Sequence, residues 1–194
     1  MLKEITLIAA AYLIGSIPTG LLLARAFGVD IRNTGSGNIG ANNVYRTLGR
    51  KVGIMTLVGD CLKGLVPVLA AKYLGISSGW IALIGLAAFL GHVYTVFLGF
   101  KGGKGVATAL GVFLGVSPVA VPAVLVIFSL VLWKWRYVSL ASVTAAVAMP
   151  VLVAVVEHNA FLILMSILIS AVVIYKHQGN IERLRAGTES RFRG

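Results

Sequence analysis

The sequence is poor in charged residues, and above all in acidic ones. Asp, Glu, Lys and Arg make up 12% of the 194 residues, against roughly 25% in a typical soluble domain. Only six residues are acidic, and the aspartates are Asp30 and Asp60, so no carboxylate cluster for a metal ion is expected. No H-E-x-x-H motif or cysteine group supplies metal ligands, and the sequence predicts neither a metal nor another cofactor. The single Cys61 excludes an intramolecular disulfide.

Apolar sequence is abundant instead. Hydrophobic residues make up 58% of the chain, and the mean hydropathy is +0.95. Five stretches approach or reach the ~20 apolar residues that cross a bilayer; they are residues 5–27, 52–74, 80–98, 138–156 and 161–175. The first is longer than the apolar region of a signal peptide and is interpreted as a retained span. The sequence therefore predicts an all-α integral membrane protein with one membrane-embedded domain over residues 1–194.

A further apolar stretch, residues 106–133, could cross the membrane once or twice. Pro118 and Pro122 disfavour an unbroken helix there. If the chain turns near Ser117 and crosses twice, the main Lys and Arg clusters all fall in the cytoplasm, as the positive-inside rule requires; they hold Arg32, Arg46, Arg50, Lys51, Lys101, Lys104, Lys134, Arg136, Arg183, Arg185, Arg191 and Arg193. The prediction is seven transmembrane helices, two of them short, with the N-terminus outside and the C-terminus cytoplasmic. The net charge of +11 is attributed to this asymmetry, and no nucleic-acid partner is expected.

This topology places every glycine-rich polar segment on the cytoplasmic side; these are residues 32–50, 99–105, 134–142 and 176–191. A transporter or channel needs polar groups at the bilayer midplane and access from both faces. Chemistry gathered at one interface favours an enzyme that acts on a cytosolic substrate and a lipid. A secondary transporter for a phosphorylated anion remains the alternative.

The polar segments are rich in groups that bind phosphate. Gly35, Gly37 and Gly40 match G-x-G-x-x-G, but the membrane context excludes a dinucleotide-binding fold, and the turn is interpreted as a phosphate-binding loop. Lys104 is followed by Gly105, so the second segment is not a Walker A loop. The candidate donors are Ser36, Gly37, Asn38, Gly40, Asn43, Arg46, Lys101, Gly102, Gly103, Lys104, Gly105, Ser142, His177, Asn180 and Arg183.

Two charged residues lie inside an apolar stretch. Asp60 and Lys63 are one helical turn apart, and charges in a bilayer are costly unless they are paired. They are interpreted as a structural ion pair that braces the site. His92 ends another apolar stretch and is interpreted as an interface residue.

Three sequence blocks carry a resemblance to a known family: "SGNIGANNVYRTLG", "GHVYTVFLGFKGGKGVAT" and "HQGNIERLRAGTES". They resemble the bacterial acyl-phosphate–glycerol-3-phosphate acyltransferases (PlsY). The resemblance implies transfer of a long-chain acyl group from acyl phosphate to the 1-hydroxyl of glycerol 3-phosphate, which begins phospholipid synthesis in the bacterial inner membrane. It also implies a soluble partner enzyme that makes the acyl phosphate.

The resemblance further assigns roles to single residues. Ser36, Arg46, His177 and Asn180 are implied to serve activity, the segment from Gly102 to Gly105 to bind the glycerol 3-phosphate phosphate, and Glu189 to be structural. In one hypothesis the donor phosphate itself accepts the hydroxyl proton, while Ser36, Asn38 and Lys104 stabilise its charge. In the other, His177 is the general base. Acyl-CoA or acyl carrier protein remains an alternative donor.

Overall fold

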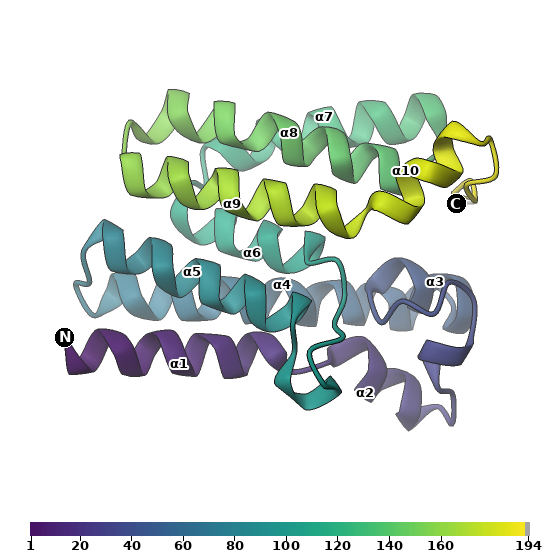
Figure 1. The fold of residues 1–194 in the computed structure, drawn as a ribbon, viewed down its shortest axis with the longest axis horizontal. Helices are drawn as coiled ribbons and strands as arrows, with labels where there is room; N and C mark the ends of the chain where they lie inside the picture. The colour runs from purple at the N-terminus through teal and green to yellow at the C-terminus, as the bar shows by residue number, and fades with distance from the viewer. Residues whose placement is uncertain (193–194) are drawn as a thin grey trace. The chain divides into compact units, whose positions relative to one another are not determined.

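The computed structural model describes residues 1–192, so Arg193 lies outside the described residues. The described chain is helical, with two short 3-10 turns (Figure 1). In order, the elements are α1 (Leu2–Ser16), α2 (Thr19–Ala26), η1 (Ile31–Asn33), α3 (Ala41–Leu48), α4 (Arg50–Tyr73), α5 (Ser78–Val93), η2 (Val96–Leu98), α6 (Val106–Val116), α7 (Ala120–Trp135), α8 (Val138–Glu157), α9 (Ala160–Lys176) and α10 (Gln178–Arg185). The chain forms two compact units, Met1–Val116 and a second that begins at Ser117.

The first unit is built on close packing of α1 against α5 and of α4 against α6 (Figure 1). Glycines make these contacts tight. A Cβ atom added to Gly15 of α1 would lie 2.0 Å from the carbonyl oxygen of Ala88 in α5. A Cβ atom on Gly111 of α6 would lie 1.9 Å from the carbonyl oxygen of Cys61 in α4. Small residues thus let the backbones touch, which is the usual way in which transmembrane helices associate.

The first apolar stretch is broken at Ile17 and Pro18, between α1 and α2. Proline has no N–H group, so carbonyl oxygens of the preceding turn lose helical partners. Side chains from other elements supply replacements. Lys63 Nζ lies 2.8 Å from the Ile17 carbonyl oxygen, and the Thr95 hydroxyl donates to the Ser16 carbonyl at 2.5 Å. The break is therefore held by α4 and by the segment that follows α5.

The second unit packs α7 against α8 and α8 against α9, and the short α10 contacts both α8 and α9. Arg136 and His158 adopt left-handed backbone conformations (φ 62° and 49°) where α7 and α8 end. Asn159 caps α9, because its side-chain oxygen accepts from the N–H groups of Phe161 (3.0 Å) and Leu162 (3.3 Å). These turns give short connections between α7 and α8 and between α8 and α9.

Four helical segments within residues 1–192 are long and apolar enough to span a membrane; they are Leu2–Ala26, Arg50–Tyr73, Ser78–Leu98 and Val138–Glu157. The bent pair α9 and α10 gives a fifth if it counts as one span. The predicted break in residues 106–133 is confirmed, since α6 ends at Val116 and α7 begins at Ala120. Both helices are shorter than the ~20 residues of a straight span. Seven spans, their orientation and the single domain stay predictions.

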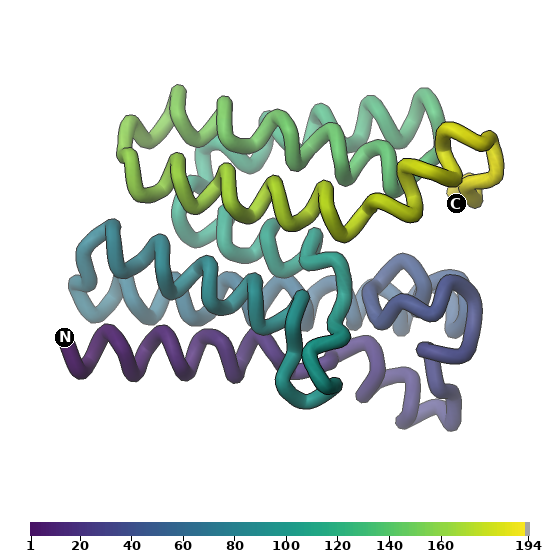
Figure 2. Tube along the Cα trace, viewed as in Figure 1, coloured from purple at the N-terminus to yellow at the C-terminus, as the bar shows by residue number. Residues whose placement is uncertain are grey.

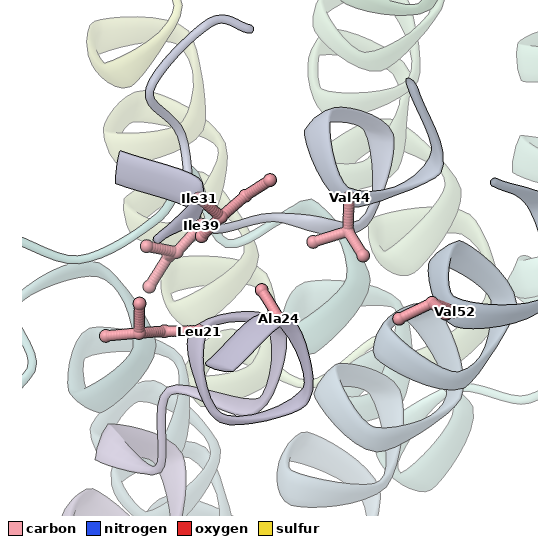
Figure 3. Packing of buried hydrophobic residues seen from close by; sticks show 6 residues of the cluster. All are labelled: Leu21, Ala24, Ile31, Ile39, Val44 and Val52. Carbon is pink, nitrogen blue, oxygen red and sulfur yellow. The ribbon is translucent and has the colours of Figure 1, made fainter. Parts of the chain in front are cut away.

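A small apolar cluster lies beneath the polar loop of the first unit, which is the segment between α2 and α3 (Figure 3). It joins α2, η1, α3 and α4 through Leu21, Ala24, Ile31, Ile39, Val44 and Val52, each at most 5% exposed. Leu98 of η2 packs against the same cluster. The loop is thus anchored by apolar side chains on both sides of its sequence, at Ile31 and Ile39.

The glycine contacts predict a steric effect on stability. Gly64→Ala would place a Cβ atom 2.2 Å from the Thr108 carbonyl oxygen, and we expect a loss of about 1–3 kcal/mol in the free energy of unfolding. Gly179→Ala is the control, because only the end of the Arg183 side chain, at 3.6 Å, lies nearby. Thermal unfolding in detergent checks both, and equal unfolding temperatures would contradict the close α4–α6 contact.

Candidate active site

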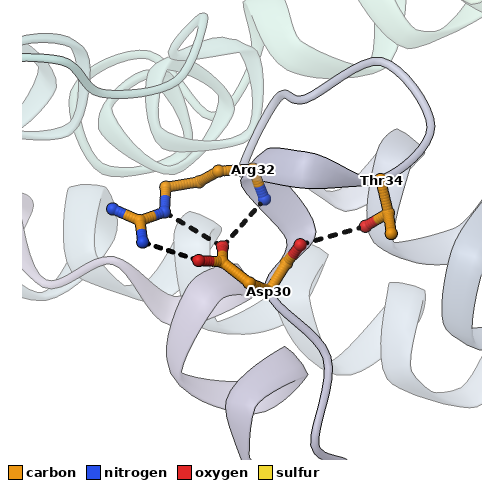
Figure 4. Close-up of polar contacts among 3 residues, drawn as sticks. All are labelled: Asp30, Arg32 and Thr34. Atoms are coloured by element: carbon orange, nitrogen blue, oxygen red, sulfur yellow. Dashed lines mark hydrogen bonds and ion pairs between the residues drawn. The ribbon is translucent and has the colours of Figure 1, made fainter.

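Near the start of the polar loop of the first unit, the Asp30 carboxylate holds the backbone in place through hydrogen bonds (Figure 4). Asp30 accepts from the backbone N–H of Arg32 at 3.1 Å and from its guanidinium at 3.0 and 2.6 Å. The Thr34 hydroxyl donates to the Asp30 carbonyl at 3.2 Å. The hydrogen bond from the guanidinium, helped by the backbone N–H, lowers the pKa of Asp30 to about 2. The charge of Arg32 is therefore neutralised locally.

Asn43 of α3 organises the loop from inside. Its side chain is 3% exposed. Its amide nitrogen donates to the carbonyls of Ile31 (3.2 Å), Thr34 (3.0 Å) and Asn38 (2.9 Å), and its oxygen accepts from the Ser36 N–H at 2.9 Å. These contacts use both N–H groups of the amide. Asn43 thus shapes the loop, and its predicted contact with a phosphate stays a prediction.

The loop amides that the glycine pattern was expected to offer to an anion are occupied internally. The Gly37 N–H donates to the Thr34 carbonyl at 3.0 Å, and the Gly40 N–H donates to the Asn38 side chain at 2.8 Å. The Ser36 side chain is exposed, and so is Arg46 on α3. An anion that reaches this loop without unfolding it would therefore meet side chains before these amides.

The second glycine-rich segment, residues 99–105, runs without helical turns from η2 toward α6 (Figure 2). Its Gly102 and Gly103 N–H groups donate to the carbonyls of Val93 and His92, both at 3.1 Å. These two glycines therefore seat the segment on the end of α5. Lys101 is exposed and Lys104 is half-buried, so the two cations differ in their access to solvent.

Three ionisable side chains gather beneath this segment. Lys63 Nζ lies 2.9 Å from Asp60 Oδ1, and His92 Nδ1 lies 3.7 Å from the same oxygen. All three side chains are at most 5% exposed. His92 was missed as a functional candidate, because a single histidine has no motif. The signal that could have found it is Asp60, since a carboxylate in a membrane helix requires partners.

In the second unit, Glu189 accepts hydrogen bonds from candidate residues of the C-terminal motif. One of its oxygens accepts from the Asn180 amide and from the Ser139 hydroxyl, both at 2.7 Å, and the other accepts from Arg183 Nε at 2.7 Å. Burial alone would raise the pKa of Glu189, but these three hydrogen bonds lower it below its ordinary value. Ser142, the other serine considered in this segment, instead donates to the Val138 carbonyl of its own helix at 2.8 Å.

His177 lies at the junction of α9 and α10 and is 3% exposed. Its Nδ1 atom lies 2.8 Å from the Val173 carbonyl oxygen. A carbonyl only accepts hydrogen bonds, so Nδ1 carries the proton and a neutral ring has its lone pair on Nε2. The tautomer is thus fixed by the preceding turn of α9, as a base or a hydrogen-bond acceptor at Nε2 would need.

The structure brings the candidates into three local groups. Ser36 and Asn38 of the first loop meet Asn43 of α3, and Gly102 and Gly103 lie over the Asp60 cluster, both in the first unit. Asn180, Arg183 and Glu189 form the third group, in the second unit. No three His, Cys, Asp or Glu side chains among residues 1–192 are placed to share a metal ion.

Comparisons with known proteins give a consistent family. A family model described as glycerol-3-phosphate acyltransferase matches residues 5–187. The chain is 69% identical over 193 residues to the glycerol-3-phosphate acyltransferase of Geotalea daltonii, covering 100% of both chains. It is 50% identical over 193 residues to that of Aquifex aeolicus, covering 98% of this chain and 100% of the relative.

Two solved structures are also similar to this chain. Both are crystal structures of PlsY, an integral membrane glycerol 3-phosphate acyltransferase, one in the glycerol 3-phosphate form and one in the lysophosphatidic acid form. The TM-scores are 0.93 and 0.91, with 48% and 47% sequence identity. Each match covers 98% of this chain and 96% of the other.

The Glu189 contacts predict a pH-dependent contribution to stability. Glu189→Gln keeps the shape but removes the charge, and we expect it to lower the free energy of unfolding by about 1–3 kcal/mol at pH 7. The folded pKa is lowered, so this stabilisation is complete above the unfolded pKa of about 4.5 and is lost as pH falls through the folded pKa. The difference between wild type and variant should therefore shrink as the pH falls below about 4.5.

Chemical unfolding in detergent at several pH values measures this difference. Arg185→Gln is the control, because it removes an exposed charge on α10. A gap between wild type and Glu189→Gln that stays constant with pH would contradict the ionised, hydrogen-bonded Glu189.

Proposed function

The chain belongs to the glycerol-3-phosphate acyltransferase family, and from this premise we propose that it transfers a fatty acyl group from acyl phosphate to the 1-hydroxyl of glycerol 3-phosphate. The products are lysophosphatidic acid and inorganic phosphate. The observation that carries the proposal is the likeness, over 98% of the chain, to an enzyme structure in its glycerol 3-phosphate form. Family membership sets aside the transporter alternative, and the enzyme is an integral membrane protein.

The chemistry of the donor suits these residues. An acyl phosphate is a mixed anhydride, so its carbonyl is already activated. The 1-hydroxyl oxygen forms a bond to the acyl carbon, the bond from that carbon to the phosphate oxygen breaks, and the hydroxyl proton passes to the leaving phosphate. Because phosphate accepts a proton near neutral pH, no metal ion and no protein base are needed in this scheme. The protein's part is to orient both substrates and to stabilise the phosphate charge.

Side chains, more than loop amides, are proposed to bind the two phosphate groups. Arg46 and Lys104 are cationic side chains, and Ser36 supplies an exposed hydroxyl. Internal hydrogen bonds occupy the amides of Gly37, Gly40, Gly102 and Gly103, which supports this division of roles. Asn38 of the first loop, together with Lys101 and Gly105 of the second, is proposed to contribute further phosphate contacts.

In the second unit, His177, Asn180 and Arg183 are proposed to serve activity, and Ser142 of α8 is proposed to bind phosphate. Asn180 and Arg183 are oriented by Glu189, which is their structural partner in this proposal. The site is proposed to face the cytoplasm at the bacterial inner membrane. There it would receive glycerol 3-phosphate from water and acyl phosphate through the lipid, from a soluble enzyme that makes the donor.

The acyl donor is tested directly. The purified enzyme is assayed in lipid-like detergent with glycerol 3-phosphate and palmitoyl phosphate, palmitoyl-CoA or palmitoyl carrier protein, while metal ions are chelated. We expect lysophosphatidic acid from palmitoyl phosphate alone. Product from a thioester would replace the proposed donor, and a requirement for added metal would contradict the metal-free scheme.

The role of His177 separates the two mechanisms. If the donor phosphate takes the proton, His177→Ala should raise KM while kcat at saturating substrate falls by less than about tenfold, since loss of a general base costs about 10²–10⁴. Steady-state kinetics with both substrates measures this. His158→Asn, at an exposed histidine in the α8–α9 turn, is the control. A fall in kcat of a thousandfold with unchanged KM would favour the general base.

A further inference from the structure

The glycine-rich segment contacts His92 through both the backbone and the ring of that residue. The Gly103 N–H donates to the His92 carbonyl at 3.1 Å. A Cβ atom on Gly102 would lie 2.0 Å from that carbonyl oxygen, whereas a Cβ atom on Gly103 would lie 2.2 Å from the ring atom Nε2. The two neighbouring glycines therefore touch different parts of the same residue.

The other side of the His92 ring faces a buried ion pair. Its Nδ1 lies 3.7 Å from Asp60 Oδ1, which also pairs with Lys63 at 2.9 Å. Lys63 also donates to the Ile17 carbonyl at 2.8 Å. The cluster thus connects α4 and α5 to the break between α1 and α2. Because a buried charge is costly without partners, the three side chains fix one another's positions.

We propose that His92 is a positioning residue for glycerol 3-phosphate. Its ring, held by Asp60 and through it by Lys63, sets the position and conformation of the glycine-rich segment, residues 99–105, which carries Lys104. This inference rests on the proposed function, in which that loop binds the glycerol 3-phosphate phosphate. His92 itself touches the loop backbone and acts through it. The absence of a side chain at Gly103 is then a requirement of the ring beneath, and not of a phosphate above.

A double-mutant cycle distinguishes the ring from the backbone. In Gly103→Ala the new methyl group collides with the ring, so His92→Ala should relieve the collision, and the double variant should be less impaired than the sum of the single effects. In Gly102→Ala the methyl group collides with the His92 carbonyl, which His92→Ala leaves in place. Gly102→Ala is therefore the matched control, and its effect should add to that of His92→Ala.

The readouts are the unfolding temperature and the separate KM values for glycerol 3-phosphate and palmitoyl phosphate. We expect His92→Ala and Gly103→Ala each to raise KM for glycerol 3-phosphate about tenfold with kcat changed less than about threefold, because a displaced loop loses ground-state binding. KM for palmitoyl phosphate should stay within about twofold. His92→Gln retains an amide that can face Asp60, and it should lie between wild type and His92→Ala. It also serves if His92→Ala does not fold.

The outcomes separate this inference from the proposed function. Additive effects of Gly103→Ala and His92→Ala on the unfolding temperature would overturn the contact. Non-additive unfolding with unchanged KM values would overturn the positioning role and leave a packing contact. Non-additive unfolding with a change in KM for palmitoyl phosphate alone would support His92 as the loop's support and overturn the assignment of glycerol 3-phosphate to this loop. An inactive wild type would contradict the proposed function, whereas the unfolding cycle would still test the contact.

Discussion

Backbone polar groups inside a bilayer must find partners within the protein, because no water is present to replace them. Helices meet this requirement by themselves, but two candidate spans of the first unit, Leu2–Ala26 and Ser78–Leu98, are interrupted after Ser16 and after Val93. Both places are closed by side chains. Lys63 and Thr95 bind the carbonyls of the first break, and the Tyr12 hydroxyl donates to the Tyr94 carbonyl at 2.5 Å. Both interruptions are thus bonded by side chains from other elements.

This constraint explains why buried charge occurs in such an apolar chain. Lys63 supplies a donor that reaches the break between α1 and α2, and its positive charge requires Asp60 nearby. The carboxylate in turn lies beside His92, which carries the glycine-rich segment. One ion pair therefore serves two purposes. It bonds the break between α1 and α2, and it lies beside His92, which supports the glycine-rich segment with its functional candidates.

The glycines have two separate uses in this fold. In α1, α4, α5 and α6 they allow backbones to touch, as at Gly15 and Gly111. In the polar segments they seat the chain on its own carbonyls, as at Gly102 and Gly103, or adopt left-handed conformations, as at Gly37 (φ 69°). Neither use leaves those particular amides for a ligand. This supports the proposal that cationic and hydroxyl side chains recognise the anions.

The sequence by itself determined the helical membrane class, the break between α6 and α7, and the segments that hold the candidate residues. Hydropathy, proline positions and the three motif blocks are local properties, and they need no knowledge of packing. The ion pair of Asp60 and Lys63 is local in the same sense, because a spacing of three residues places both on one helix face.

Only the tertiary structure decided which groups face one another across long sequence separations. It turned the Asn43 side chain inward onto four backbone groups, placed His92 between Asp60 and Gly103, and joined Glu189 to Ser139. The residue types alone could not reveal this, because an asparagine or a histidine serves a ligand and a backbone equally well. Which of the two it meets depends on the neighbour that packing provides.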